Sequence, residues 1–316
     1  MHIGIDVGGT KIAIGVIDKD NKIVYQKAIL TKRERTVSEI IRDIIELINE
    51  SIILANKTSI EITTIGIGVP GIVELSGNVI QCVNLGWYNI QFRNILEKEF
   101  NLPIYIANDA SLAALAEYKI GAMKNVQSGV MLTLGTGIGG GIIINGNIHN
   151  GFHGVGSEIG HMVIGENFYN CNCGKNGCFE TFASATALKK YTKRLLEQKK
   201  STILEEMTNR DINRLNGKII FEAAYKGDEI AIKVIDWYVK YLGIGIVNLI
   251  NIIDPEVVVL GGGISRAGSF LLDRIIEVVD NNKLIKTLPI GKIVLAELDN
   301  KAGFIGAALL GKQKII

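Results

Sequence analysis

The stretch HIGIDVGGTKIAIGVI at residues 2–17 holds two apolar runs that are joined by Gly8-Gly9-Thr10. Runs of β-branched residues on either side of a glycine turn are typical of paired strands. A third apolar run follows a second turn at residues 18–21. The first thirty residues therefore predict three consecutive strands, at residues 3–7, 12–17 and 23–29.

The same pattern returns near the middle of the chain. An apolar run at residues 130–134 leads into the turn Gly135–Gly137, and a second run at residues 140–144 leads into another turn and a short third strand. Two copies of one supersecondary unit indicate a duplicated architecture.

Helical and strand-like segments alternate after each copy, which predicts an α/β protein with a largely parallel sheet in the later part of each unit. Isoleucines at helical spacing mark the first helix, and Asp254-Pro255 ends the longest one. We expect Ser265 to cap the helix that follows the last glycine run. The predicted helices are 38–54, 110–118, 184–198, 219–226 and 229–253, and the predicted strands are 62–69, 104–107 and 257–260.

Composition indicates a folded, globular protein. The 316 residues are 47% hydrophobic and 21% charged, and this length suggests about two domains. The net charge is +2 and no block of like charge is present, so the composition gives little support to nucleic-acid or membrane binding. Residues 125–157 carry no formal charge, but their glycines favour strand–turn–strand over a membrane helix. With no secretory signal in MHIGIDVGGT, we expect a soluble, cytoplasmic protein.

The turn Asp6-Val7-Gly8-Gly9-Thr10-Lys11 can bind phosphate. Its glycines let backbone N–H groups approach a phosphate, Thr10 offers a hydroxyl, Lys11 a positive charge, and Asp6 could hold Mg²⁺ or its waters. An ordinary hairpin turn is the alternative interpretation.

Two further glycine runs strengthen the case for a nucleotide. Gly135, Thr136 and Gly137 occupy the matching place in the second copy, and Gly262 and Gly263 follow the strand at residues 257–260. Three such loops favour a nucleoside triphosphate held through its phosphates, with the third beside its base or sugar. The sequence holds no Walker A loop, and no G-x-G-x-x-G follows a predicted strand and opens a helix as dinucleotide binding requires.

Asn108-Asp109 lies at a predicted strand end. Transfer of a phosphoryl group to an alcohol needs a carboxylate that accepts the hydroxyl proton, and Asp109 is the candidate. The alternative is that Asp109 only caps the helix at residues 110–118.

One imidazole and three thiols form the sharpest local signal. His161, Cys171, Cys173 and Cys178 supply a complete tetrahedral set for a structural zinc, and reduced cysteines packed in a loop are the alternative. A closed zinc site would fix the loop and position Glu158 and Glu180, whose carboxylates beside an imidazole suit a polyhydroxylated ligand. Cys82 is expected to be a small apolar filler.

Taken together, the chain resembles the ROK family of sugar kinases, repressors and open reading frames, and in particular its bacterial glucokinase branch. The resemblance spans essentially the whole chain. Its motifs are D-x-G-G-T-K at residues 6–11, V-P-G at 69–71, N-L-G-W at 84–87, N-D at 108–109, L-G-T-G-I-G-G-G at 134–141, E-I-G-H at 158–161, C-x-C-G-x-x-G-C-x-E at 171–180 and G-G-G at 261–263.

The resemblance implies the actin-like, ribonuclease H-like duplicated two-domain ATPase fold, with a cleft between the domains. Residues 1–118 and a C-terminal helix at about 300–316 would form a small α/β domain, and residues 119–299 a large α/β domain with the zinc-binding loop. Asp109 would be the catalytic base. The sugar would be bound by Gly71, Asn108, Asp109, Glu158, His161 and Glu180.

The function expected from this resemblance is ATP- and Mg²⁺-dependent phosphorylation of the 6-hydroxyl of a hexose, with glucose as the first choice. N-acetylmannosamine, N-acetylglucosamine, fructose and allose remain alternative substrates, polyphosphate an alternative donor, and a non-catalytic sugar sensor an alternative function. The first strand starts at residue 2 or 3, so we expect no DNA-binding domain ahead of it. A homodimer or higher homo-oligomer is what the family suggests.

Overall fold

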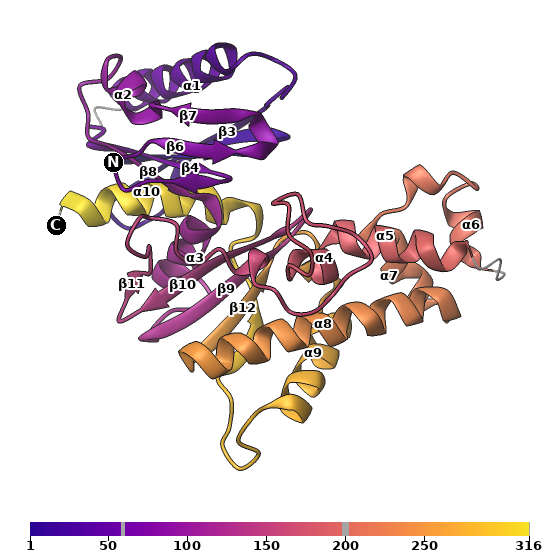
Figure 1. The fold of residues 1–316 in the computed structure, drawn as a ribbon. Helices are drawn as coiled ribbons and strands as arrows, with labels where there is room; N and C mark the ends of the chain where they lie inside the picture. The colour runs from indigo at the N-terminus through magenta and orange to yellow at the C-terminus, as the bar shows by residue number, and fades with distance from the viewer. Residues whose placement is uncertain (58–60, 198–201, 316) are drawn as a thin grey trace. The chain divides into compact units, whose positions relative to one another are not determined.

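The computed structural model describes residues 1–57, 61–197 and 202–315 (Figure 1). Its internal contacts divide the chain into two compact units. Unit 1 comprises Met1–Gln127, Gly141–Ser157 and Glu297–Ile316, and unit 2 comprises Ser128–Gly140 and Glu158–Ala296. Residue 198 of the helix expected at 184–198 and residue 316 of the expected C-terminal segment lie outside the described residues.

A mixed five-stranded sheet of order β3-β2-β1-β4-β8 forms the centre of unit 1. The three strands expected from the first thirty residues are confirmed, and they pair antiparallel, whereas β4 and β8 join β1 in parallel. The strands are β1 (His2–Val7), β2 (Lys11–Ile17), β3 (Ile23–Leu30), β4 (Thr64–Val69) and β8 (Ile104–Asn108).

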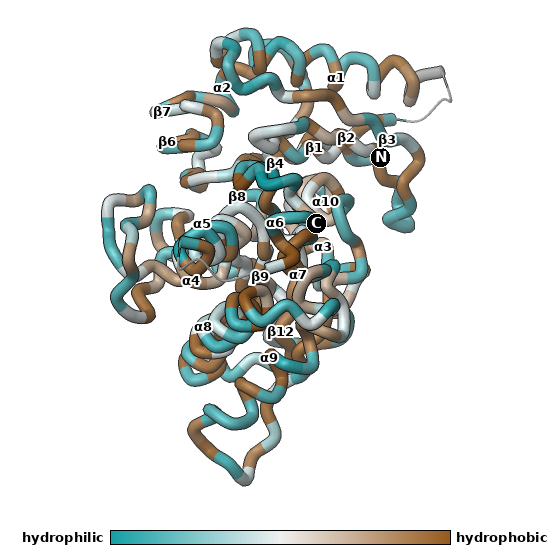
Figure 2. Tube along the Cα trace, turned by 90° about the vertical axis from the view of Figure 1, so that its right-hand side faces the viewer, coloured by the Kyte–Doolittle hydropathy of each residue, from teal (hydrophilic) through white to brown (hydrophobic). Residues whose placement is uncertain are grey.

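Helices and a small second sheet complete unit 1. The amphipathic pattern of α1 (Val37–Lys57) is visible in Figure 2, where hydrophilic and hydrophobic residues alternate along its tube, and Ile40, Ile44 and Ile48 are fully buried. A three-stranded antiparallel sheet of order β5-β6-β7 adds to the same core. The remaining elements are β5 (Ile72–Val73), β6 (Val79–Cys82), η1 (Val83–Leu85), β7 (Trp87–Ile90), α2 (Phe92–Glu97), α3 (Asp109–Ile120), η5 (Asp299–Lys301) and α10 (Ala302–Ile315).

The C-terminal helix α10 packs directly on β1, β4 and α3 of unit 1. Glycines on the two strands make this approach possible, because a Cβ at Gly4 would collide with the Phe304 carbonyl and one at Gly66 with the Ala307 carbonyl. A side chain at either position would push the helix off the sheet. The last fourteen-residue helix therefore belongs to the core that the N-terminal strands begin.

A second mixed five-stranded sheet has the order β11-β10-β9-β12-β13, and the division between the units falls within β10. The strand–turn–strand copy expected near residue 130 is confirmed: β9 (Ser128–Leu134) and β10 (Ile138–Ile144) flank the Gly135–Gly137 turn, and β11 (Asn147–Ile148) follows. β9, β12 (Val257–Gly261) and β13 (Lys292–Leu295) are parallel.

Helices of unit 2 pack against one another, with α8 contacting α4, α5, α7 and α9. The 25-residue α8 (Glu229–Ile253) has the bounds expected from the sequence, because Asp228 caps its first turn and Asp254 adopts a left-handed conformation at its end. The other helices are η2 (Ile159–His161), α4 (Glu180–Ala183), α5 (Ala185–Leu196), α6 (Ile203–Met207), η3 (Ile212–Arg214), α7 (Gly217–Tyr225), η4 (Ile264–Ala267) and α9 (Ser269–Asn282).

No helix in the described part of the chain combines the length and the apolar character needed to cross a lipid bilayer.

Candidate functional site

The parallel strands of unit 1 bring their carboxyl ends to one edge of the sheet. Asp6 on β1 lies opposite Gly68 on β4, and Val69 on β4 lies opposite Asn108 on β8. Ligands of open α/β sheets bind beyond such strand ends. The two aspartates singled out from the sequence, Asp6 and Asp109, therefore stand at the same edge, two strands apart.

Asn108, and not Asp109, occupies the cap position of α3. Its side-chain oxygen accepts hydrogen bonds from the N–H groups of Ala110 (2.9 Å) and Ser111 (3.1 Å), and its amide nitrogen donates to the Gly71 carbonyl (3.1 Å). Asp109 is the first helical residue, and one of its oxygens accepts from the Ala110 N–H at 2.8 Å. The alternative in which Asp109 serves only as the helix cap is therefore wrong, because its neighbour does that work.

Loss of water raises the pKa of both carboxyl groups at this edge. The pKa of Asp6 is raised to about 7, chiefly by burial and also by the negative charge of Asp109, while the ammonium of Lys11 acts to lower it. Burial likewise raises the pKa of Asp109, and the Ala110 N–H lowers it. The thiol of Cys82, fully buried as the apolar filler expected, has its pKa raised to about 12 by the same loss of water. A carboxyl with a raised pKa is a better proton acceptor than an ordinary aspartate.

The glycine turn of unit 1 lies next to Asp6 along the chain. The Gly8 N–H donates to the Lys11 carbonyl at 2.9 Å, and Thr10 and Lys11 are exposed. Asn84 of the N-L-G-W motif lies beside Gly9, since a Cβ added at Gly9 would sit 3.5 Å from the Asn84 Cβ. A partly exposed turn rich in N–H groups, a lysine and a partly buried carboxyl form the setting expected for phosphate and its Mg²⁺.

Two of the glycine runs come together within unit 2. Gly262 has a φ of 86°, and a Cβ there would meet the Leu134 carbonyl oxygen at 2.6 Å, directly before the Gly135–Gly137 turn. Gly263 precedes η4, a single 3₁₀ turn. The expectation that Ser265 caps the following helix is wrong: its hydroxyl donates to the Gly262 carbonyl at 2.8 Å, and α9 begins later, after Gly268.

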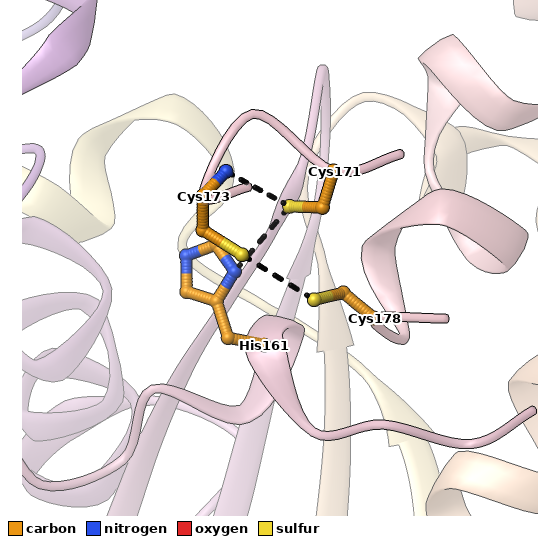
Figure 3. A group of neighbouring side chains, drawn as sticks. All are labelled: His161, Cys171, Cys173 and Cys178. Atoms are coloured by element: carbon orange, nitrogen blue, oxygen red, sulfur yellow. Dashed lines mark hydrogen bonds between the residues drawn. The ribbon is translucent and has the colours of Figure 1, made fainter. Parts of the chain in front are cut away.

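The four expected metal ligands form one cluster. The ligand atoms of His161, Cys171, Cys173 and Cys178 all lie within 4.8 Å of one another, and Figure 3 shows the three sulfur atoms and one ring nitrogen gathered together. The Cys171 Sγ is 3.6 Å from His161 Nδ1, and the Cys173 and Cys178 sulfurs are 3.5 Å apart. A tetrahedral zinc with ordinary bond lengths needs about 3.5 Å between the ring nitrogen and a sulfur and about 3.8 Å between two sulfurs. The cluster therefore fits a closed, structural zinc site.

Both glutamates expected at the sugar lie next to this cluster. Glu180 Oε1 accepts from the Cys171 thiol at 2.9 Å, and Glu158 Oε2 is 3.9 Å from His161 Nε2. His161 thus turns Nδ1 to the sulfurs and Nε2 to a carboxylate, as the two distinct nitrogens allow. Gly137 brings the glycine turn to the same place, because a Cβ there would collide with Glu180 Oε2.

The residues that hold this loop were not predicted from the sequence. The Asn167 amide donates to the carbonyl and hydroxyl of Thr181 (2.7 and 3.0 Å), and the Tyr169 hydroxyl donates to the same carbonyl at 2.8 Å. Thr181 follows Glu180, so these bonds fix the start of α4. An asparagine and a tyrosine with partners twelve or more residues away carry no local pattern that could have marked them.

The matches to known proteins cover nearly the whole chain. The model of the ROK family matches residues 2–314. A glucokinase from Halalkalibacterium halodurans is 37% identical over 99% of this chain and 95% of its own length, and a xylose repressor from Caldicellulosiruptor bescii is 33% identical over 96% of this chain and 76% of its own length. The crystal structure of a ROK family glucokinase from Streptomyces griseus in complex with glucose and AMPPNP superimposes with a TM-score of 0.84, at 32% identity over 99% of both chains. These matches, together with the two mixed five-stranded sheets and the His/Cys cluster, establish that the chain belongs to the ROK family and has its two-domain, actin-like ATPase fold.

Proposed function

We propose that the protein is an ATP-dependent kinase that phosphorylates the 6-hydroxyl of a hexose, with glucose as its preferred substrate. The observation that carries this proposal is the state of Asp109: its carboxyl has a raised pKa and stands directly after β8, on the first residue of a helix that Asn108 already caps. The glucokinase names of full-length relatives, and a relative solved with glucose and AMPPNP, support the same reaction.

In the proposed reaction Asp109 accepts the proton of the sugar 6-hydroxyl. The hydroxyl oxygen forms a bond to the γ-phosphorus of ATP while the bond from that phosphorus to ADP breaks, so the products are the sugar 6-phosphate and ADP. Gly71, Asn108, Glu158, His161 and Glu180 are assigned to the sugar hydroxyls. Water must be kept from Asp109 at this stage, because it could otherwise accept the phosphoryl group.

The glycine runs are assigned to the nucleotide. The free backbone N–H groups at Gly9 and Thr10 and at Thr136 and Gly137 would face phosphate oxygens, with Lys11 adding charge. Gly8 and Gly135 would shape the two turns, because their own N–H groups donate to the Lys11 and Gly137 carbonyls. Gly262 and Gly263 would lie at the base or ribose. Asp6 would hold Mg²⁺ or its waters, and the metal would neutralise charge that develops on the phosphates. Zinc at the His/Cys cluster would keep the loop around Glu180 in place and take no part in the chemistry.

A coupled assay of ADP release over a panel of sugars tests the proposal. Glucose should give the highest kcat/KM among glucose, N-acetylmannosamine, N-acetylglucosamine, fructose and allose, and glucose 6-phosphate dehydrogenase should accept the product. A preference of only a few-fold for glucose would leave a broader hexose kinase. Comparing ATP with polyphosphate in the same assay decides the donor.

The similarity to xylose repressors favours one second candidate, a sugar sensor without catalysis. Such a protein would gain thermal stability from a sugar but release no ADP from ATP. ADP release that requires both glucose and an intact Asp109 rules this candidate out. The homo-oligomeric state that the family suggests is a separate proposal, which light scattering on the purified protein tests.

A further inference from the structure

Each of the two glycine turns is fixed by a threonine that belongs to another segment of its own unit. In unit 1, the Thr31 hydroxyl donates to the Gly8 carbonyl at 2.6 Å and the Thr31 N–H donates to the Thr10 carbonyl at 2.9 Å. In unit 2, the Thr186 hydroxyl donates to the Thr136 carbonyl at 2.7 Å, and the N–H of the preceding Ala185 donates to the Gly135 carbonyl at 2.8 Å. Both copies thus use one hydroxyl and one N–H on two carbonyls.

The amide groups of the same turns have been left available. Among residues 1–57, 61–197 and 202–315, no hydrogen bond takes up the N–H of Gly9 or Thr10 in the first turn, or of Thr136 or Gly137 in the second. A carbonyl that turned toward a phosphate would repel it, whereas a free N–H attracts it. The orientation of two or three peptide groups therefore decides whether such a turn binds an anion.

We propose that Thr31 and Thr186 are positioning residues for the nucleotide phosphates. By holding the turn carbonyls, each threonine keeps the free N–H groups of its turn in one orientation before ATP arrives. The proposal rests on the proposed ATP-dependent function. Two residues outside the glycine motifs would thus contribute to the affinity for ATP.

Thr31 is itself held firmly enough to do this. Its side chain is fully buried, and its carbonyl accepts from Arg35 Nη2 at 2.9 Å. Arg35 is in turn ion-paired with Asp43 on α1. A partly buried, two-pronged arginine–carboxylate pair has a defined geometry, so the turn is tied through Thr31 to a 21-residue helix. Thr186 lies in the first turn of α5, and the cap that Ser184 makes on this helix holds Thr186 in place.

Threonine-to-valine variants remove the hydroxyl and keep the branched shape. We expect Thr31→Val and Thr186→Val each to raise the KM for ATP by about 3- to 10-fold, the loss of one hydrogen bond, with the KM for glucose unchanged. Thr31→Ser and Thr186→Ser keep the hydroxyl and should restore the KM for ATP. The gain in melting temperature on adding AMPPNP with Mg²⁺ should fall in the valine variants and return in the serine variants, which reports on binding without turnover.

Thr192→Val is the matched control. The Thr192 hydroxyl is fully buried and donates to the Leu188 carbonyl at 2.7 Å within α5, and not to a carbonyl of either turn, so its loss should lower the melting temperature alone. Valine variants with the wild-type KM for ATP would overturn the proposal, as would equal rises in the KM for ATP and for glucose, or serine variants as impaired as valine variants. If Thr31→Val does not fold, the KM for ATP of Thr186→Val and Thr186→Ser decides the test, because Thr186 is partly exposed. A wild-type protein that neither binds AMPPNP nor releases ADP would instead overturn the proposed function itself.

Discussion

The negative charge of Asp109 raises the pKa of Asp6, in addition to the larger effect of burial on the same carboxyl. The two residues stand at the ends of β1 and β8 in one sheet, with only β4 between these strands. A Cβ at Gly303, in the first turn of α10, would approach the Asp6 carboxylate to 2.5 Å. Asp6 is therefore crowded by a helix on one side and is short of water, and both facts have consequences that can be measured.

Asp6→Asn should stabilise the protein above neutral pH. The pKa of Asp6 is raised in the folded protein from 3.8 to about 7, so folding is favoured by its proton below pH 4 and loses that contribution as the pH rises through about 7. At pH 8, without metal or nucleotide, the free energy of unfolding of the variant should exceed that of the wild type by roughly 1–4 kcal/mol. Urea titrations at pH 4, 6 and 8 measure this difference, which should vanish at the lowest pH. A constant difference across the three would contradict the argument.

Asp109→Asn should slow turnover strongly and leave folding and sugar binding intact. The asparagine oxygen can still accept from the Ala110 N–H, but the side chain can no longer take a proton, so kcat should fall by about 10² to 10⁴-fold. Glucose should still raise the melting temperature of the variant. Asp18→Asn is a suitable control, because Asp18 also accepts backbone N–H groups, from Asp20 and Lys22, but lies in an exposed turn. Near-normal kcat in folded, sugar-binding Asp109→Asn would remove Asp109 from the role of base.

The sequence predicted the local parts of this structure well, for a physical reason. A glycine turn between β-branched runs specifies a hairpin whatever surrounds it, and both copies formed as expected. The long helix ended where expected because Asp228 and Asp254 terminate it through their own backbone geometry and side chains. The glycine turns and the His/Cys cluster also lie at the positions of their sequence motifs.

Residues whose hydrogen-bond partners lie far away in the sequence were not predicted. Asn108 and Asp109 are both good helix caps, and only the Gly71 carbonyl, 37 positions away, shows why Asn108 takes that place. Ser265 has a side chain that can cap a helix, but its hydroxyl donates instead to the carbonyl of Gly262, a residue with positive φ. Thr31 and Thr186 reach turns 23 and 50 residues away. Such contacts depend on the packed fold, so no local pattern announces them.

Gly137→Ala should weaken sugar binding through Glu180. The new Cβ would collide with Glu180 Oε2, and because that atom is the end of a flexible side chain the carboxylate would move away. We expect the KM for glucose to rise by about 10-fold, the cost of one charged hydrogen bond, with a smaller change in the KM for ATP. Gly135→Ala in the same turn is the control, since its Cβ would meet nothing within 4 Å, and its KM for glucose should stay that of the wild type. Equal effects of the two variants would mean that the phosphate turn, and not Glu180, was disturbed.

Cys173→Ala tests the link between the metal cluster and the sugar. Elemental analysis of the wild type should find about one zinc per chain, because three thiolates and one imidazole complete a tetrahedron. The variant should lose its zinc and raise its KM for glucose by about 10- to 100-fold, since Cys171 and the adjoining Glu180 carboxylate would no longer be fixed. Its KM for ATP should change far less. Cys82→Ala, in the core of unit 1, should keep both the zinc and the wild-type KM for glucose. A zinc-free, folded Cys173→Ala variant with an unchanged KM for glucose would show that the loop keeps Glu180 in place without the metal, through Asn167 and Tyr169 alone.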